Sequence, residues 1–403
     1  MNDSSRGQDH LRSPAEAAPS PSSRRRTAIL VLGMHRSGTS AVSGVLNALG
    51  AAVPKKTLMG ADQTNQSGYF ESFALAVAHD EMLASAGSHW HDWREFDPQW
   101  ARSDVAEQHR RKIKAILVEE FDDEPLILVK DPRICRFIPL MLSVLTELNF
   151  SPVAILPIRN PLEVAHSLRR RNGFGLPKSI LLWLRHVLDA EFHSRPLPRC
   201  FLPYEELLND WRHYVDRAAA TIGVAWPGQF DRSDGIDRFL TAGLRHERAS
   251  FDDMSDHPAV SPVACETYRI LRDIAADGES GELLDKLDLL RARFTEGCRI
   301  FGPAVAAEEL ASADSGLIAE RHSLAAAHDN LTSRYDALVQ ARDKVTAERD
   351  VLARDRNRLR VERDSLAAAC NELRVERGTL LASRSWRMTA PLRSLANYFK
   401  RQR

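Results

Sequence analysis

Residues 36–40, with the sequence RSGTS, have the residue types of a site that binds a phosphate-like anion. An arginine and three hydroxyl groups supply hydrogen-bond donors, and Gly33 and Gly38 let the backbone curl so that its N–H groups face one point. An apolar run precedes the segment at 28–32, and apolar residues recur at helical spacing over 42–49. This order of strand, turn and helix points the positive end of the helix at an anion, so it predicts a phosphate cradle.

The same loop departs from the pattern of nucleoside triphosphatases. Gly33 and Gly38 are five residues apart and Ser40 stands where such enzymes hold Mg²⁺, but Thr39 occupies the position of their obligatory lysine. A P-loop phosphotransferase or nucleoside triphosphatase therefore stays only an alternative prediction. Lys130 weakens it further, because it interrupts the apolar run before the one acidic residue that could hold the metal ion.

Two further cations stand just past the ends of apolar runs. Lys130 follows one run, and Arg159 follows another, with Ser167 eight residues further along. Ligands of parallel α/β sheets bind in the crevice beyond the carboxyl ends of the strands. Arg36, Lys130 and Arg159 are therefore expected to face one crevice and to bind a polyanion. The arginines at 169–171 are expected on a solvated face.

Four apolar runs alternate with helix-like segments, as a mostly parallel sheet flanked by helices requires. The runs are 28–32, 126–129, 153–158 and 200–202. The predicted fold class is α/β, with a P-loop-like sheet followed by a long C-terminal heptad-repeat helix. Pro157 lies inside the third run, and proline is confined to strand ends, edge strands or bulges. This strand is therefore expected to end near Leu156.

In order and spacing, these motifs resemble the sulfotransferases that use 3′-phosphoadenylyl sulfate, in particular the tyrosylprotein- and glycan-sulfotransferase branch. The RSGT loop resembles their 5′-phosphosulfate loop, and the spacing of Arg159 and Ser167 resembles their grip on the 3′-phosphate. Lys130 resembles the catalytic lysine of the tyrosine branch. The YEEL segment at 204–207 resembles the same family more weakly. The resemblance as a whole spans roughly residues 27–300.

The resemblance implies an enzyme that transfers a sulfuryl group from this donor to an acceptor hydroxyl, on a glycan or glycolipid. Arg36 and Lys130 would neutralise the charge that develops as the bond breaks, and Glu71 would act as general base. No metal is implied. The residues implied to bind the donor are Arg36, Ser37, Gly38, Thr39, Ser40, Arg159 and Ser167.

The general base is the least defined part of this site. Glu71 lies in a loop rich in Gly, Asn and Gln, and a surface glutamate that caps the following helix would have the same sequence context. Three other residues are alternatives for the base, because they would lie near the opening of the same crevice if residues 72–84 form a helix: His79, Asp80 and His91. The sequence leaves this choice open.

The composition limits the classes of function. The 403 residues carry 55 basic and 55 acidic side chains, so no net charge favours nucleic acid as a partner. Five scattered cysteines without metal-ligand spacing are typical of reduced thiols. The sequence has no signal-peptide core and no apolar run of bilayer length, so we expect a cytoplasmic enzyme, with peripheral attachment to a membrane as an option.

The predicted organisation has five parts: a disordered leader (1–26), a sulfotransferase domain (27–301), a linker (302–316), a coiled coil or long helix (317–382) and a basic amphipathic tail (383–403). In the fourth part, leucine or valine stands at every seventh position from Leu317 to Leu380, the period of a supercoil. The column predicts a homo-oligomer. The other seam positions are polar, so a solvated single helix is the alternative.

The tail has six basic and no acidic residues together with leucine and aromatic side chains, which suits a membrane surface or a protein partner. Its SWRMTAPLR segment resembles the ends of bacterial enzymes that build cell-surface polysaccharides. A third class of function follows from these C-terminal parts. A non-catalytic scaffold would owe its role to the long helix and the tail.

Overall fold

The computed structural model describes residues 26–62, 65, 68–97, 99–228, 233–240 and 248–400. The chain divides into two compact units, Met1–Val305 and Ala306–Arg403. The predicted disordered leader at 1–26 lies outside the described residues, except for Arg26, which begins the first strand.

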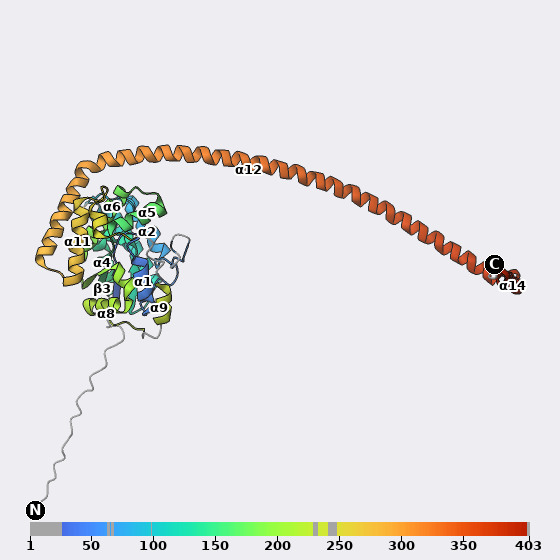
Figure 1. The fold of residues 1–403 in the computed structure, drawn as a ribbon, viewed down its shortest axis with the longest axis horizontal. Helices are drawn as coiled ribbons and strands as arrows, with labels where there is room; N and C mark the ends of the chain where they lie inside the picture. The colour runs from blue at the N-terminus through green and yellow to red at the C-terminus, as the bar shows by residue number, and fades with distance from the viewer. Residues whose placement is uncertain are drawn as a thin grey trace, which may run out of the picture. The chain divides into compact units, whose positions relative to one another are not determined.

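The first unit contains, within its described residues, a four-stranded parallel sheet, and this confirms the predicted α/β class (Figure 1). Val31 pairs with both Lys130 and Ile155, so the carboxyl ends of the first three strands meet at one edge of the sheet. Each strand coincides with one of the four apolar runs. The strands, in the order β2-β1-β3-β4, are β1 (Arg26–Val31), β2 (Leu126–Lys130), β3 (Phe150–Ile158) and β4 (Arg199–Pro203).

The prediction that the third strand ends near Leu156 is wrong, because β3 continues through Pro157 to Ile158. β1 pairs with β3 only as far as Ile155, whereas β4 pairs with it as far as Ile158. The N–H of Ala154 points toward β4. Backbone N–H groups alternate in direction along a strand, so the nitrogen of Pro157 points toward β1. Pro157 lies beyond the last residue of β3 that pairs with β1, so its missing N–H removes no hydrogen bond between the strands.

Successive strand residues point to opposite faces of the sheet, so the apolar strands build two cores. Ala28 and Leu30 lie in one core, and Ile29 and Val31 lie in the other. The helices that contribute to the first core include α2 (Phe73–Ser85), α3 (Asp104–Phe121), α4 (Ile138–Glu147), α5 (Pro161–Asn172), α6 (Leu176–Ser194) and α11 (Pro262–Asp277). Those of the second are α1 (Thr39–Ala48), α7 (Tyr204–Asn209), α8 (Trp211–Ile222) and α9 (Ser233–Phe239).

Local sequence determines where two helices near the carboxyl edge of the sheet begin and end. Oγ of Ser72 accepts a hydrogen bond from the N–H of Leu75 at 3.1 Å and caps α2. Asn160 caps α5, whose first residue is Pro161, and the helix ends at Gly173 with φ 73°. The connections include three short helices, η2 (Trp100–Arg102), η3 (Pro132–Arg136) and α10 (Phe251–Ser255).

The helix α12 (Gly281–Ala382) continues without a break through residues 302–316, where a linker was predicted. The boundary between the two units, after Val305, lies inside that segment. It contains Pro303, which has no N–H to donate to the preceding turn. Its first part belongs to the core of the first unit, where Leu287 and Phe294 are buried.

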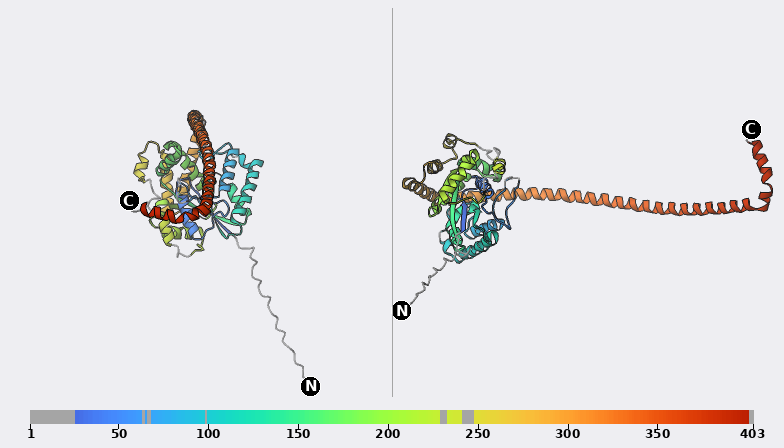
Figure 2. Two further views of the ribbon diagram at one scale, coloured as in Figure 1. Left: turned by 90° about the vertical axis from the view of Figure 1, so that its right-hand side faces the viewer. Right: turned by 90° about the horizontal axis from the view of Figure 1, so that it is seen from below.

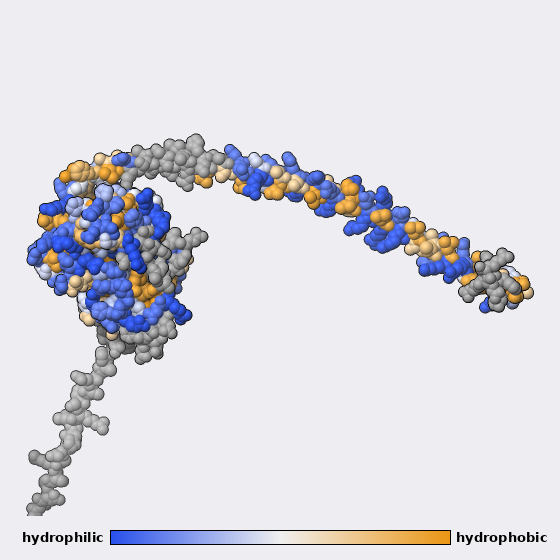
Figure 3. Space-filling view, viewed as in Figure 1, coloured by the Kyte–Doolittle hydropathy of each residue, from blue (hydrophilic) through white to orange (hydrophobic). Residues whose placement is uncertain are grey.

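The second unit consists of the rest of α12 and two short helices, α13 (Arg384–Met388) and α14 (Ala390–Lys400). The predicted long C-terminal helix is confirmed by α12, although this helix begins at Gly281 and not at residue 317, and its ribbon is unbroken (Figure 2). Members of its heptad column are exposed, Leu352 by 68%, and apolar and polar residues alternate along it (Figure 3). Coverage of this column by a second chain stays a prediction. None of the described helices is long and apolar enough to span a bilayer.

Candidate active site

The loop between β1 and α1 turns through two residues in the left-handed region, Arg36 with φ 71° and Gly38 with φ 90°. Gly38 N-caps α1 without a side-chain hydrogen bond, so the first N–H groups of the helix have no acceptor from a capping side chain. Oγ of Ser37 is buried and has no hydrogen-bond partner among the described residues. These donors fit an anion at the N-terminus of the helix.

Tyr204, the first residue of α7, packs against this loop directly after β4. A Cβ atom at Gly38 would lie only 2.2 Å from Cδ2 of the tyrosine ring, so the close approach requires glycine. The guanidinium carbon of Arg159 lies 4.8 Å from the centre of the same ring. The tyrosine of the YEEL segment therefore supports both the loop and one of the predicted phosphate-binding residues.

Three predicted donor-binding residues, Arg36, Arg159 and Ser167, form one network. Nε of Arg36 donates to Oγ of Ser167 at 2.8 Å, and Nη1 of Arg159 donates to the carbonyl oxygen of Arg36 at 2.9 Å. Nε of Arg159 also pairs with Oε2 of Glu163 at 2.9 Å, one turn along α5. Because Glu163 is buried, this ion pair holds the arginine firmly at the carboxyl end of β3.

Positive charge is concentrated around this network. The pKa of Arg36 is lowered to about 10, first by burial and then by the guanidinium groups of Arg171, Arg159 and Arg170. A bound polyanion would relieve the repulsion between these neighbouring cations, so its binding is electrostatically favourable. Arg171 lines the pocket together with Arg36 and Arg159, so the expectation that residues 169–171 all lie on a solvated face is wrong for Arg171.

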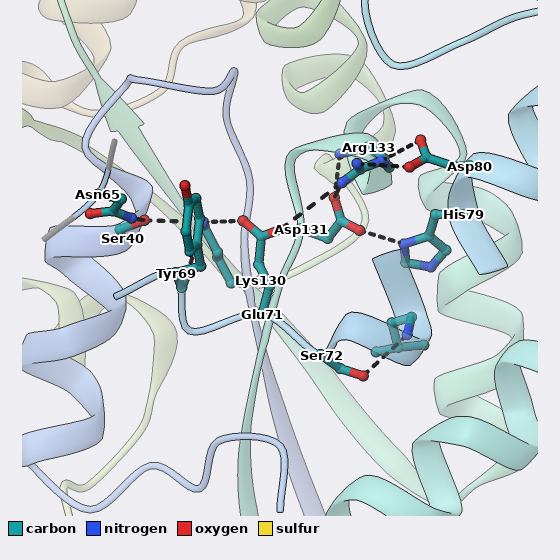
Figure 4. A network of polar contacts seen from close by, with 11 residues as sticks. Ser40, Asn65, Tyr69, Glu71, Ser72, His79, Asp80, Lys130, Asp131 and Arg133 are labelled. Atoms are coloured by element: carbon teal, nitrogen blue, oxygen red, sulfur yellow. Dashed lines mark hydrogen bonds and ion pairs between the residues drawn. The ribbon is translucent and has the colours of Figure 1, made fainter. Parts of the chain in front are cut away.

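Lys130, at the end of β2, lies in the same pocket as the loop (Figure 4). Its Nζ donates to the carbonyl oxygen of Tyr69 at 3.0 Å and to Oγ of Ser40 at 3.2 Å. It also forms an ion pair with Glu71, and both charged side chains are almost fully buried. The structure thus brings Lys130, Glu71 and the loop together, although they are far apart in sequence.

Glu71 is only 3% exposed, and Ser72 caps α2, so Glu71 is not a surface residue that caps the helix. Burial raises the pKa of Glu71, while the neighbouring positive charge of Lys130 acts in the opposite direction. A carboxylate whose pKa is raised is a better proton acceptor than an exposed glutamate. The environment of Glu71 therefore suits a general base.

The three alternative bases do not line the pocket. The helix expected over 72–84 is present as α2, but Nδ1 of His79 contacts Oδ2 of Asp131 at 2.8 Å. Asp80 is held by Arg133 in a two-pronged contact of 2.7 and 2.9 Å. Burial lowers the pKa of His91 to about 4, which makes it a weak base. Of the four candidates, Glu71 is the one in the pocket.

Asp131 and Arg133 form a second polar group behind Glu71. Burial opposes ionisation of Asp131, yet Arg133 and the hydrogen bond from His79 keep its pKa below the ordinary value. Arg133 approaches Glu71 to 4.0 Å as well. No group of three or more His, Cys, Asp or Glu side chains in the described part of the chain is placed to hold a metal ion.

The pocket also contains polar residues that the sequence did not assign to the site, among them Asn65, Tyr69 and Arg171. Nδ2 of Asn65 donates to Oγ of Ser40 at 3.2 Å. Arg171 lies four residues after Ser167, on the same face of α5, so helical spacing from a predicted ligand would have identified it. Asn65 and Tyr69 have no such signal, because the fold of a long loop places them.

Comparisons with known proteins found no matching family model and no matching curated protein. One similar solved structure is a sulfotransferase domain from the Synechococcus PCC 7002 olefin synthase, with 15% identity, 63% of this chain and 91% of that chain covered, and a TM-score of 0.33. Another is a sulfotransferase domain from the curacin biosynthetic pathway, with 14% identity, 63% and 99% covered, and a TM-score of 0.34. Such low values carry no argument about activity, which rests on the site itself.

Proposed function

We propose that this chain is a sulfotransferase that moves the sulfuryl group of 3′-phosphoadenylyl sulfate to an acceptor hydroxyl. The observation that carries the proposal is the network in which Arg159 donates to the carbonyl of Arg36 while Arg36 donates to Ser167. It joins a helix N-terminus, which suits one anionic group, to a second cluster of donors, which suits another. A donor with separate 5′ and 3′ anionic groups matches this pair.

Each cluster has its own task. The backbone N–H groups and hydroxyls of residues 36–40 would hold the 5′-phosphosulfate, and Arg159 with Ser167 would hold the 3′-phosphate. Buried Ser37, with no partner among the described residues, supports this assignment. When bound, the donor would supply a sulfuryl group on a phosphate leaving group.

Two cations would stabilise the negative charge that develops in the reaction, and one carboxylate would accept the proton of the acceptor. Arg36 and Lys130 would neutralise negative charge as it develops, an interaction that is stronger in the transition state than in the ground state. Glu71 would accept the proton of the acceptor hydroxyl. Its pKa is raised by burial and held down by Lys130, so any turn of Lys130 away from Glu71 would strengthen the base.

The acceptor in this proposal is a hydroxyl of a glycan or glycolipid. The SWRMTAPLR resemblance supports it, and so does the tail, where α14 carries the exposed Leu392 and Leu395 among basic residues. Such a helix can rest on an anionic membrane surface. We place the enzyme in the cytoplasm, with this tail as a contact to a membrane or a protein partner.

Thermal denaturation separates the three classes of function. We expect adenosine 3′,5′-bisphosphate to raise the melting temperature of the full chain without metal, because a ligand that binds the folded state stabilises it. Stabilisation by ATP with Mg²⁺ alone would favour a phosphotransferase, and no shift with either nucleotide would favour the scaffold. Transfer of labelled sulfur from the donor to saccharides, slowed by about 10²–10³-fold in Lys130→Ala, then tests the reaction.

A further inference from the structure

Arg133 lies at the junction of three carboxylates (Figure 4). Its Nε and Nη2 donate to the two oxygens of Asp80 at 2.7 and 2.9 Å, and its Nη1 donates to Oδ1 of Asp131 at 3.0 Å. The same Nη1 lies 4.0 Å from Oε2 of Glu71, which is beyond hydrogen-bond distance. The guanidinium group is therefore hydrogen-bonded to two carboxylates and has only an electrostatic contact with the third.

The position of Arg133 is fixed from both sides. Oδ1 of Asp131 also accepts a hydrogen bond from the backbone N–H of Arg133 at 2.9 Å, and Oδ2 of Asp131 contacts Nδ1 of the buried His79 at 2.8 Å. On the other side, the two-pronged contact with Asp80 fixes the plane of the guanidinium group. The charge of Arg133 therefore stays at one place relative to Glu71 when other side chains move.

The two oxygens of Glu71 face different cations. Oε1 forms the ion pair with Lys130, and Oε2 is the oxygen that Arg133 approaches. Lys130 carries its charge on a flexible stem and also donates to Ser40, in the loop proposed to hold the donor. Glu71 thus has one cation that can turn toward the donor and one that cannot.

Several charged groups act on the ionisation of Glu71. Burial raises its pKa, the positive charges of Lys130 and Arg133 lower it, and the negative charge of Asp131 raises it. Arg171 of α5 also interacts electrostatically with Glu71. Among the described residues no ion-pair contact joins Arg171 to Glu71, so Arg133 is the closer of these two cations. If Lys130 turned away, Arg133 would be the nearest positive charge left beside the carboxylate.

We propose that Arg133 is a positioning residue for the base, which keeps Glu71 ionised and oriented while Lys130 turns toward the departing phosphate oxygen. The inference rests on the proposed sulfotransferase function. In that reaction the acceptor oxygen bonds to sulfur, its proton passes to Glu71, and the bond from sulfur to the phosphate oxygen breaks. Lys130 is needed at the breaking bond at the moment when the buried carboxylate still needs a counter-charge. Because Arg133 makes no hydrogen bond to Oε2 of Glu71, that oxygen stays able to accept the proton.

Infrared titration of the full chain measures the midpoint of ionisation of Glu71 without any need for turnover, because the carboxyl band that is absent in Glu71→Gln identifies the residue. We expect Arg133→Met to raise this midpoint by about 1 pH unit, since a positive charge at this distance stabilises a carboxylate by that order. Asp80→Asn should lower the midpoint, because it removes a negative charge and releases Arg133 toward Glu71. A merely structural role would not move the midpoint in opposite directions.

The matched control is Arg195→Met. Arg195 also makes a two-pronged contact with a carboxylate, that of Glu191, but it does not line the pocket. This variant should leave the midpoint of Glu71 unchanged. In steady-state assays the acidic limb of kcat should move with the midpoint in each variant, and raising the pH should restore most of the turnover that Arg133→Met loses.

Three results would overturn the inference: an unchanged midpoint in Arg133→Met, shifts of the same sign in Arg133→Met and Asp80→Asn, or an equal shift in Arg195→Met. If Arg133→Met does not fold, an unchanged midpoint in Asp80→Asn overturns it alone, because the side chain of Asp80 is 47% exposed and can be replaced without a buried gap. Binding of adenosine 3′,5′-bisphosphate is measured for every variant. Failure of the wild-type chain to bind it would refute the proposed function instead.

Discussion

Lys130 and Glu71 form a buried ion pair between the carboxyl end of β2 and the loop that leads into α2. The same lysine donates to Ser40, next to the N-terminus of α1. One side chain therefore contacts both the loop that would hold the donor and the carboxylate that would take the proton. Neither role can be changed without affecting the other.

Lys130→Ala is expected to lower kcat by about 10²–10³-fold, the range for loss of one preorganised stabiliser of charge, with a smaller effect on donor affinity. Steady-state rates of labelled-sulfur transfer measure it. Because the variant leaves Glu71 buried without its counter-charge, it should also lose stability, and adding Glu71→Gln should restore stability but not turnover. A raised KM with an unchanged kcat would instead mean that Lys130 only binds substrate.

Gly38→Ala should abolish binding of adenosine 3′,5′-bisphosphate, because the new Cβ would meet the ring of Tyr204 at 2.2 Å. Gly87→Ala is the matched control, since Gly87 also has positive φ but no atom within 4 Å of the Cβ position. Both variants bear the backbone strain of about 1–2 kcal/mol, so only the clash distinguishes them. Equal nucleotide binding by the two variants would contradict the role of close packing in the loop.

Asp131→Asn should destabilise the fold at pH 7 by about 3 kcal/mol, because it breaks a buried ion pair with Arg133. The pKa of Asp131 is lowered in the folded state, so its stabilisation is complete above the ordinary value of 3.8 and is lost as pH falls below it. Urea denaturation at several pH values should show the difference from wild type shrinking toward acid. Asp123→Asn, at an exposed position, is the control, and a difference independent of pH would refute the assignment.

The heptad column predicts self-association through 317–382. Leu338→Lys with Leu352→Lys should convert a larger species into a monomer in sedimentation at tens of micromolar, because both side chains belong to the column. Val361→Lys with Val375→Lys is the matched control, since these residues are equally exposed but lie off the column. If the wild-type chain is already a monomer, the solvated single helix is the correct alternative.

The sequence predicted most of the sheet, because strands buried on both faces are continuous apolar runs. The predicted end of the third strand near Leu156 was wrong because a proline is tolerated where the neighbouring strand has already ended. Where that strand ends relative to Pro157 depends on the register between β1 and β3. Sequence alone does not contain that register.

The resemblance to sulfotransferases predicted Arg36, Arg159 and Ser167 as donor-binding residues, and the three lie in one network. It failed for Arg171, because in a run of three arginines only the one that shares a helical face with Ser167 reaches the pocket.

The most direct test of the account is the preference for a 3′-phosphate, measured by calorimetric titration of the full chain with adenosine 3′,5′-bisphosphate and with adenosine 5′-phosphate. The account predicts that wild type prefers the bisphosphate without any metal, and that Arg159→Ala loses about 2–5 kcal/mol of that preference. The exposed Arg169→Ala should keep it. An Arg159→Ala variant that still prefers the bisphosphate as strongly as wild type would contradict the assignment of this site.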